Sequence, residues 1–130
     1  MAVLVDTSVW IDFFKRDNPL DLSMYVEPDE IVTCLPVIQE ILQGFSDEGV
    51  YRLAKSSLFS LPILETPISQ VVFEEAVDLY RIARRQGYTI RSSVDCLIAA
   101  CALRNDVLVL HRDRDFSNLA LVSSLRQQSV

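Results

Sequence analysis

The sequence predicts an α/β fold, in which a central, mainly parallel β-sheet is flanked by α-helices within a single domain over residues 1–130. Short apolar runs alternate along the chain with longer segments whose apolar residues recur at helical spacing. The apolar runs are continuous, which is typical of strands that are covered on both faces. The chain has 130 residues, 50% of them hydrophobic, and no glycine- or serine-rich linker, so one core is expected.

The first predicted elements are a strand and a short helix. Residues 2–5, with the sequence Ala-Val-Leu-Val, form an apolar run that predicts a buried strand. Asp6 therefore falls at the C-terminal end of this strand. Residues 8–14 follow as a predicted helix, for which Thr7 or Ser8 provides the N-cap, because a side-chain hydroxyl can accept a hydrogen bond from the first helical turn.

A second strand and further helices follow. We expect a short helix over residues 19–27 and a strand over residues 30–34. Pro36 then begins a helix, because the first helical turn does not use the backbone N–H that proline lacks, and Gly44 helps to end it. Another helix is predicted over residues 47–58.

The clearest helical pattern follows a short strand predicted at residues 62–64. Ser69 introduces this helix, and Gly87 supplies its C-terminal stop. Acidic side chains come early in the helix and basic ones late, an order that the helix dipole favours. Its last turns hold a basic cluster that we interpret as part of this charge pattern, namely Arg81, Arg84 and Arg85.

The last predicted elements are a helix, a strand and a short helix. Ser92 and Asp95 have the spacing of a capping box and lead into a helix over residues 96–104. Residues 107–110 are another continuous apolar run and predict the last strand. The tail from Asp115 onwards is expected to form a short helix.

The composition excludes several kinds of protein. The three cysteines, Cys34, Cys96 and Cys101, are odd in number, lack C-x-x-C spacing and lie in apolar segments, so neither zinc binding nor disulfides are expected. No apolar run approaches the roughly 20 residues that a membrane-spanning helix requires, so no membrane span is expected. The N-terminus lacks the basic region of a signal peptide, and we expect a cytoplasmic protein.

The net charge of −6 and the pI near 4.6 bear on the type of ligand. An acidic protein has no general attraction for nucleic acid, because Lys and Arg make the phosphate contacts. The acidic excess is also consistent with carboxylates gathered around a cation, with any RNA held by a local subset of the 12 Lys and Arg residues. The bulk charge does not distinguish these interpretations.

Four acidic residues occupy positions that suggest one shared pocket. Asp6 and Asp113 each follow a buried strand, and α/β sheets bind ligands at the C-terminal ends of their strands. Asp95 lies in the first turn of an otherwise apolar helix, and Glu40 lies in the helix after the second strand. Carboxylates this close repel one another unless a cation lies between them. Hard oxygen ligands select Mg²⁺ or Mn²⁺, and the chemistry that follows is phosphodiester hydrolysis.

Each of these residues, taken alone, also has a structural explanation. An Asp after a strand is often a turn residue or a helix cap, and an Asp in a first helical turn serves the helix dipole. Glu40 alone is typical of a solvated helix residue, Asp115 of the cap of the next helix, and His111 of a core or strand-end residue. The sequence contains no convincing Ser-His-Asp or Cys-His set and no glycine-rich phosphate loop.

Four segments in a fixed order give the chain a family resemblance. They are residues 3–11 (VLVDTSVWI), 39–44 (QEILQG), 93–100 (SVDCLIAA) and 110–116 (LHRDRDF). Together they resemble a PIN-domain protein and, more narrowly, the VapC-type toxins of bacterial and archaeal VapBC toxin-antitoxin pairs. The similarity extends over nearly the whole chain.

The resemblance implies a PIN-like fold and an Mg²⁺- or Mn²⁺-dependent endoribonuclease. It also implies a homodimer and a cognate VapB-like antitoxin whose tail enters the active site. The family roles fall on an acidic quartet formed by Asp6, Glu40, Asp95 and Asp113. In this assignment Asp6, Asp95 and Asp113 hold the metal directly or through water, and Glu40 orients or deprotonates the attacking water.

Supporting roles fall on neighbouring residues. Thr7 or Ser8 is the polar companion of Asp6, and Asp115 is an alternative or a supplement to Asp113 as the fourth acid. The best candidates for phosphate contacts lie beside the site, although their positions equally suit solvated surface residues: Arg91, Arg112 and Arg114.

Two other classes of protein remain open. A phosphotransfer or receiver-type α/β domain also places acids at strand ends, but Asp6-Thr7-Ser8 lacks the second Asp of a D-x-D pair, and arginines follow the last strand where a lysine would be needed. A catalytically silent interaction module with the same fold is the second class. Retention of the full acidic quartet disfavours it.

Overall fold

The computed structural model describes the whole chain, residues 1–130, and contains one five-stranded sheet. Every neighbouring pair of strands is parallel, and the strand order is β3-β2-β1-β4-β5. The strands are β1 (Val3–Val5), β2 (Ile31–Cys34), β3 (Ile63–Leu64), β4 (Leu108–His111) and β5 (Gln127–Ser129). The prediction of an α/β fold with a central, mainly parallel sheet is therefore confirmed.

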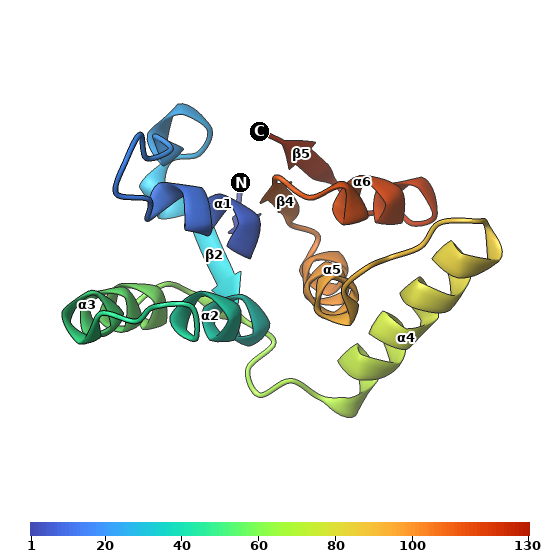
Figure 1. Ribbon diagram of the computed structural model, residues 1–130. Helices are drawn as coiled ribbons and strands as arrows, with labels where there is room; N and C mark the ends of the chain where they lie inside the picture. The colour runs from blue at the N-terminus through green and yellow to red at the C-terminus, as the bar shows by residue number, and fades with distance from the viewer.

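Six α-helices flank the sheet (Figure 1). They are α1 (Thr7–Phe13), α2 (Leu35–Leu42), α3 (Glu48–Phe59), α4 (Gln70–Arg85), α5 (Ser93–Asn105) and α6 (Arg114–Leu121). None has both the length and the apolar character needed to cross a membrane.

The segment before β2 differs from the prediction of one helix over residues 19–27. It contains two short 3₁₀ helices, η1 (Leu22–Met24) and η2 (Pro28–Glu30). Pro28 disfavours a helical conformation for the residue before it, and Glu27 is indeed extended. The helical conformation is therefore interrupted between the two short helices.

The chain adds strands on both sides of β1. It first moves outward through β2 and β3, and then returns past β1 to add β4 and β5 on the other side. Because crossovers between parallel strands are right-handed, these two directions place the connecting helices on opposite faces of the sheet. In Figure 1, α2 and α3 lie to the left of α4 and α6. β1 is thus the strand at which the order reverses, and α/β sheets bind ligands at the C-terminal edge of such a point.

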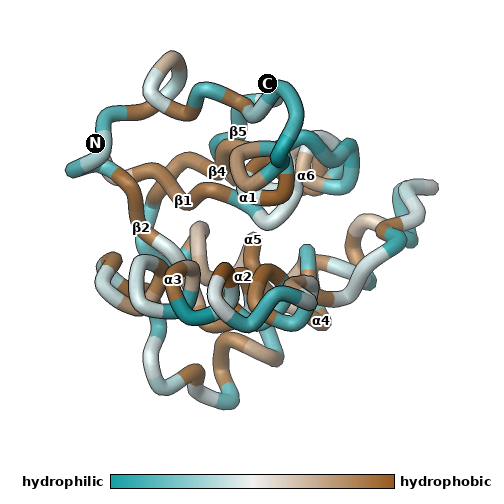
Figure 2. Tube along the Cα trace, turned by 60° about the vertical axis from the view of Figure 1, so that its left-hand side comes forward, coloured by the Kyte–Doolittle hydropathy of each residue, from teal (hydrophilic) through white to brown (hydrophobic).

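The core lies around the inner strands and α5. A single cluster of 31 buried hydrophobic residues connects the sheet with the helices. Small side chains at Ala99, Ala100 and Ala102 have no exposed surface, so α5 packs closely against its neighbours. Figure 2 shows the apolar character of β1, β4 and α5 in the interior. Because β1 and β4 are anchored in this core, the residues that directly follow them have fixed positions.

The fifth strand is absent from the sequence prediction. β5 consists of polar residues and pairs in parallel with β4, with Val109 opposite Gln127. An edge strand held by backbone hydrogen bonds does not need an apolar face, so hydropathy does not reveal it.

One predicted N-cap is wrong, and one predicted capping box is not formed. The N-cap of α1 is Asp6 and not Thr7 or Ser8, because the side chain of Asp6 accepts a hydrogen bond from the Ser8 backbone N–H at 3.0 Å. Ser92 does precede α5, but its side chain makes no capping hydrogen bond. Its backbone N–H instead donates to the side chain of Asp115 at 3.3 Å, so the predicted capping box is not formed.

Candidate active site

Asp6 lies at the C-terminal end of β1, on the central strand of the sheet. Its backbone N–H donates to the carbonyl oxygen of Leu110 in β4 at 2.9 Å, which fixes its position. The residue is 3% exposed, and its Oδ2 atom accepts hydrogen bonds from the backbone N–H (3.0 Å) and the hydroxyl (2.6 Å) of Ser8. The Oδ1 atom is buried without a hydrogen-bond partner. One oxygen of the carboxylate is therefore held by the protein, and the other is available to a ligand.

Ser8 connects the ends of the two central strands. Its hydroxyl donates to Asp6 and accepts a hydrogen bond of 2.9 Å from the backbone N–H of Arg112, the residue that follows β4. This bridge fixes the end of β1 relative to the end of β4. Of the two predicted companions of Asp6, Ser8 is the one that bonds to its side chain.

Glu40 enters the site from α2 and is held by the other predicted companion. The hydroxyl of Thr7 donates to Oε1 of Glu40 at 2.8 Å. Thr7 is 9% exposed and is the first residue of α1, directly after Asp6. The two neighbouring hydroxyls therefore orient different acids, because Ser8 bonds to Asp6 and Thr7 bonds to Glu40.

Three aspartates from α5 and the start of α6 form the second half of the site. One carboxylate oxygen from each of Asp95, Asp113 and Asp115 lies within 4.8 Å of the others. Asp95 is 5% exposed and Asp115 is 1% exposed, whereas the side chain of Asp113 is 26% exposed. Oδ2 of Asp95 and Oδ1 of Asp115 are buried without hydrogen-bond partners. Two acids of the cluster, Asp95 and Asp115, are therefore buried, and Asp113 is partly exposed to solvent.

Asp115 is held more firmly than the sequence predicts. Its Oδ2 atom accepts hydrogen bonds from the backbone N–H groups of Arg91 (3.1 Å) and Ser92 (3.3 Å). The N-cap of α6 is Asp113, whose Oδ1 atom accepts a hydrogen bond of 2.9 Å from the Asp115 backbone N–H. The interpretation of Asp115 as this cap is therefore wrong. Because α6 begins directly after Asp113, Asp115 falls inside the first turn and points into the cluster.

Burial and mutual repulsion raise the pKa values of two of these carboxyls. Burial raises the pKa of Asp6, hydrogen bonds from the start of α1 offset part of this effect, and the charge of Glu40 adds to it. Burial raises the pKa of Asp95 to about 9, together with the proximity of the Asp115 carboxyl and the charges of neighbouring acids that include Asp6 and Asp113. Without a cation, the cluster therefore retains a proton at neutral pH that a solvated carboxyl would lose.

His111 positions the site and does not enter it. It is 1% exposed, and its Nδ1 atom accepts a hydrogen bond of 3.1 Å from the Asp113 backbone N–H. The proton therefore lies on Nε2, which donates to Oε1 of Gln127 in β5 at 2.6 Å. The interpretation of His111 as a buried strand-end residue is confirmed.

The three arginines predicted to contact phosphate have different surroundings. Arg91 forms ion pairs with two acids of the site, at 3.2 and 3.7 Å. Arg112 forms an ion pair with Asp12 in α1. Arg114 is exposed, and no ion pair links it to another side chain. Two of the three guanidinium groups are therefore already neutralised by carboxylates.

The five carboxylates of the site fit a hard divalent cation. Asp6, Asp95 and Asp115 each have a buried oxygen without a hydrogen-bond partner. Such atoms are costly to bury, and a cation among them would satisfy them and remove the repulsion between the acids. Mg²⁺ and Mn²⁺ prefer oxygen ligands of this type, and the site contains neither the thiolate nor the imidazole ligands that zinc usually takes.

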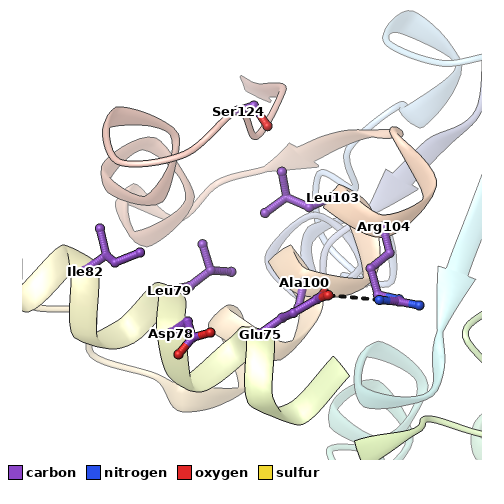
Figure 3. A pocket seen from close by; sticks show the side chains of 8 residues that line it. All are labelled: Glu75, Asp78, Leu79, Ile82, Ala100, Leu103, Arg104 and Ser124. Carbon is purple, nitrogen blue, oxygen red and sulfur yellow. Dashed lines mark hydrogen bonds and ion pairs between the residues drawn. The ribbon is translucent and has the colours of Figure 1, made fainter. Parts of the chain in front are cut away.

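A separate pocket of about 550 Å³ lies between α4, α5 and the turn after α6 (Figure 3). Its lining consists of Glu75, Asp78, Leu79, Ile82, Ala100, Leu103, Arg104 and Ser124. Arg104 is engaged with Glu75 at 2.9 Å, as the figure shows. The pocket shares no residue with the acidic cluster, so it is not a part of the same site.

Sequence reasoning missed the groups that hold the acids in place. Gln127 orients His111, and the backbone N–H groups of Arg91 and Ser92 hold Asp115. The Gln127 contact has no local signal, because it depends on a strand that the hydropathy pattern does not show.

Comparisons with known proteins agree on one family. The model of the PIN domain matches residues 3–122. Among curated proteins, the chain is similar to VapC ribonuclease Mb1587 from Mycobacterium bovis and to ribonuclease VapC11 from Mycobacterium tuberculosis. In each case the identity is 34% over 132 residues, and the match covers 98% of this chain and 98% of the relative.

Solved structures share the fold. One is VapBC-1 from nontypeable Haemophilus influenzae, with a TM-score of 0.74 and 16% identity, covering 99% of this chain and 98% of the other. Another is VapBC-5 from Mycobacterium tuberculosis, a member of the VapBC family of toxin-antitoxin systems. Its TM-score is 0.67 at 21% identity, covering 100% of this chain and 98% of the other.

Proposed function

Because this chain belongs to the PIN-domain family, we propose that it is a metal-dependent endoribonuclease, the toxin of a VapBC-type toxin-antitoxin pair. The observation that supports this most directly is the cluster of Asp95, Asp113 and Asp115, whose carboxylate oxygens lie within 4.8 Å of one another beside the strand-order reversal of the sheet. The relatives that match over nearly their full length are ribonucleases by name. The chain is thus a hydrolase whose substrate bond is the RNA phosphodiester.

The acids divide into metal ligands and a base. We assign the cation, Mg²⁺ or Mn²⁺, to Asp6, Asp95 and Asp113, with Asp115 as a further ligand because its Oδ1 atom is buried and accepts no hydrogen bond. The ion, when bound, supplies a Lewis acid that neutralises charge on the phosphodiester. Asp6 and Asp115 each keep one oxygen bonded to backbone N–H groups, so their free oxygens stay oriented into the site.

Glu40 orients the attacking water and accepts its proton. Its Oε1 atom is bonded to the Thr7 hydroxyl, which leaves Oε2 for the water. The water oxygen forms a bond to phosphorus while the bond from phosphorus to the leaving ribose oxygen breaks. The proton of the water passes to Glu40, and the leaving oxygen takes up a proton from solvent.

Replacing Thr7 with valine should lower kcat by roughly tenfold or more, because the hydroxyl that orients Glu40 is lost. The same loss should reduce the free energy of unfolding by about 1 kcal/mol. Cleavage of a fluorogenic oligonucleotide and thermal melting measure the two effects. Thr7→Ser is the matched control, because it keeps the hydroxyl and should retain most of the activity. A valine variant with the wild-type kcat would contradict the positioning role.

The partners follow from the family assignment. We propose that the chain is inhibited by a VapB-like antitoxin, because the solved structures that share its fold include VapBC-1 and VapBC-5, the latter a member of a family of toxin-antitoxin systems. We also propose RNA as its substrate and a homodimer as its assembly, as the family resemblance implies. We also propose that residues 1–130 form one domain, since one buried cluster joins β1, β2 and β4 to all six α-helices. We further propose that the protein acts in the cytoplasm, where an RNA substrate is found.

The direct test is incubation of the purified protein with total cellular RNA, followed by mapping of the new ends. We expect cleavage with Mg²⁺ and none with EDTA or with the Glu40→Gln variant. Absence of Mg²⁺-dependent ends would contradict the nuclease assignment. Calorimetry with Mg²⁺ then separates it from a silent interaction module, because a nuclease should bind the ion more weakly after Asp95→Ala, whereas equal binding without cleavage would favour the silent module.

A further inference from the structure

An RNA substrate must approach five carboxylates, so the protein needs positive charge that is free to hold phosphates. Of the three arginines beside the acids, Arg91 and Arg112 are already ion-paired with carboxylates, which leaves Arg114 as the one free cation there. Phosphate contacts come mainly from Lys and Arg, and a cation that is neutralised within the protein contributes less to them. The overall charge of −6 adds no attraction.

Three free arginines lie together at the C-terminal end of α4. Arg81, Arg84 and Arg85 are exposed, and none makes an ion pair or a side-chain hydrogen bond to the rest of the protein. Arg81 and Arg85 are four residues apart, a spacing at which like charges on a helix repel each other. The dipole at the helix end offsets part of this repulsion. The cluster is therefore a concentration of positive charge that no carboxylate of the chain neutralises.

Two tyrosines stand beside these arginines. A surface pocket of about 590 Å³ is lined by Val77, Tyr80, Arg81, Arg84 and Arg85. A smaller pocket of about 220 Å³ is lined by Tyr80, Arg84, Tyr88 and Thr89. The two pockets share Tyr80 and Arg84, so they are adjacent. Guanidinium groups that bind phosphate, next to aromatic rings that stack on bases, are the combination used for single-stranded RNA.

The turn after α4 connects this cluster to the acidic site. Gly87 adopts φ +89°, and the Tyr88 backbone N–H donates to the carbonyl oxygen of Ala83 at 2.9 Å, which closes the end of the helix. Arg91 follows Arg85 by six residues, and its backbone N–H donates to the acidic site. Six residues span at most about 20 Å, so the cluster and the acids are a few nucleotides apart. Figure 1 shows this segment running from the end of α4 to the start of α5.

We propose that Tyr80, Arg81, Arg84, Arg85 and Tyr88, here called the arginine–tyrosine patch, bind single-stranded RNA beside the cleavage site. The arginines contact backbone phosphates, and the tyrosines stack on unpaired bases. The inference rests on the proposed ribonuclease function and adds to it the surface that holds the substrate. Because phosphate and stacking contacts tolerate any base, the patch contributes affinity and direction to the RNA strand and does not select a sequence.

The first test measures RNA binding without cleavage. In an Asp6→Asn background, fluorescence anisotropy follows a 20-nucleotide uridine strand across a series of KCl concentrations. We expect R84Q/R85Q to weaken the affinity about tenfold or more and to reduce the slope of log K against log salt by about 1.4, the value for two phosphate contacts on a single strand. R52Q/K55Q is the control for bulk charge, because it also removes two exposed cations, from α3. Arg52 is paired with Glu48 at 3.5 Å, but such an exposed pair is weak, and the variant should change the affinity less than about twofold.

The second test separates stacking from charge. Tyr88→Ala should weaken binding roughly fivefold or more without changing the salt slope, whereas Tyr88→Phe should preserve binding because it keeps the ring. Thermal melting verifies that each variant is folded, since Tyr88 packs partly against the core. If Tyr88→Ala is unfolded, Tyr88→Leu replaces it, because leucine fills part of the same space without an aromatic ring and should weaken binding to the same extent.

The third test uses the active chain. R84Q/R85Q in the otherwise unchanged protein should raise the KM for a 20-nucleotide RNA about tenfold and leave kcat and the cleavage of a dinucleotide unchanged, because a dinucleotide is too short to reach the patch.

Equal loss of affinity in R84Q/R85Q and R52Q/K55Q would overturn the proposal, since the effect would then be one of bulk charge. Unchanged RNA affinity with weakened self-association would also overturn it and assign the arginines to a protein contact. Failure of the wild type to cleave RNA would contradict the ribonuclease function, while the binding measurements would still test the patch.

Discussion

Replacing Asp6 with asparagine should reduce RNA cleavage by roughly 10²- to 10³-fold or more and leave the protein folded. The substitution removes the negative charge of the carboxylate on the central strand, whose Oδ1 atom is buried and free for a cation. Folding should persist, because asparagine is also a good N-cap and can accept the same hydrogen bond from the Ser8 backbone N–H. Cleavage of a fluorogenic RNA and circular dichroism measure the two properties.

The matched control for this substitution is Asp12→Asn. Asp12 lies in α1, the same helix that Asp6 caps, and forms ion pairs with Lys15 and Arg112 outside the acidic site. It undergoes the same chemical change, and its loss should cost less than about tenfold in activity, since partly exposed ion pairs contribute little. Equal activity of the two variants, both folded and in the presence of Mg²⁺, would remove Asp6 from the mechanism.

Replacing Asp95 with asparagine should stabilise the metal-free protein at neutral pH while it abolishes cleavage. The pKa of Asp95 is raised to about 9 by burial, by the proximity of the Asp115 carboxyl and by the charges of neighbouring acids. The unfolded chain has an ordinary aspartate pKa near 3.9, so between about pH 4 and pH 9 the folded state binds more protons than the unfolded state. The free energy of unfolding of the metal-free wild type therefore falls as pH rises through this range.

Asparagine cannot ionise and still offers an N–H donor to Asp115, so this contribution to the pH dependence should disappear. We expect the variant to be more stable at pH 7 by about 1–2 kcal/mol, which is equivalent to a rise in Tm of roughly 4–10 °C. Thermal melting in EDTA from pH 5 to pH 9 measures the difference. Asp78→Asn, an exposed aspartate in α4, is the control and should leave the pH profile unchanged.

Magnesium should reverse the order of stability. Wild-type protein should gain Tm on addition of Mg²⁺, because a ligand that binds only the folded state stabilises it, and Asp95→Asn should gain less. Asp95→Asn could instead be less stable than wild type in EDTA at every pH. The carboxyl would then stabilise the fold, and it would be wrong to interpret the cluster as a cation site that lowers the free energy of unfolding of the metal-free protein.

The residues that the sequence places in the site are those next to strongly patterned elements. Asp6 follows the apolar run of β1 and Asp113 lies two residues after β4, so their positions at one edge of the sheet follow once the strands are known to be parallel. Asp95 lies in a helix whose other buried residues are apolar, so a carboxylate at this position indicates a site. Glu40 has a weaker signal, because a Glu in a helix is ordinarily solvated.

The contacts that hold these acids could not be predicted in the same way. Ser8 and Thr7 are equivalent in sequence, and only the direction of α1 decides that Ser8 bonds to Asp6 and Thr7 to Glu40. The role of Asp115 depends on where α6 begins, and helix boundaries are the least certain part of a sequence prediction. Local patterns therefore indicated the acids, while long-range geometry determined their hydrogen bonds.

The pairing of β1 with β4 also governs when the catalytic centre can exist. Asp6 lies near the start of the chain, and its backbone partner Leu110 and the bridge from Ser8 to Arg112 come more than 100 residues later. Contacts of such long sequence separation form only after most of the chain is available. A partly synthesised chain thus contains Asp6 and Glu40 without the aspartates that complete the site. The cell that makes this protein is exposed to its nuclease activity only after translation has passed Asp115.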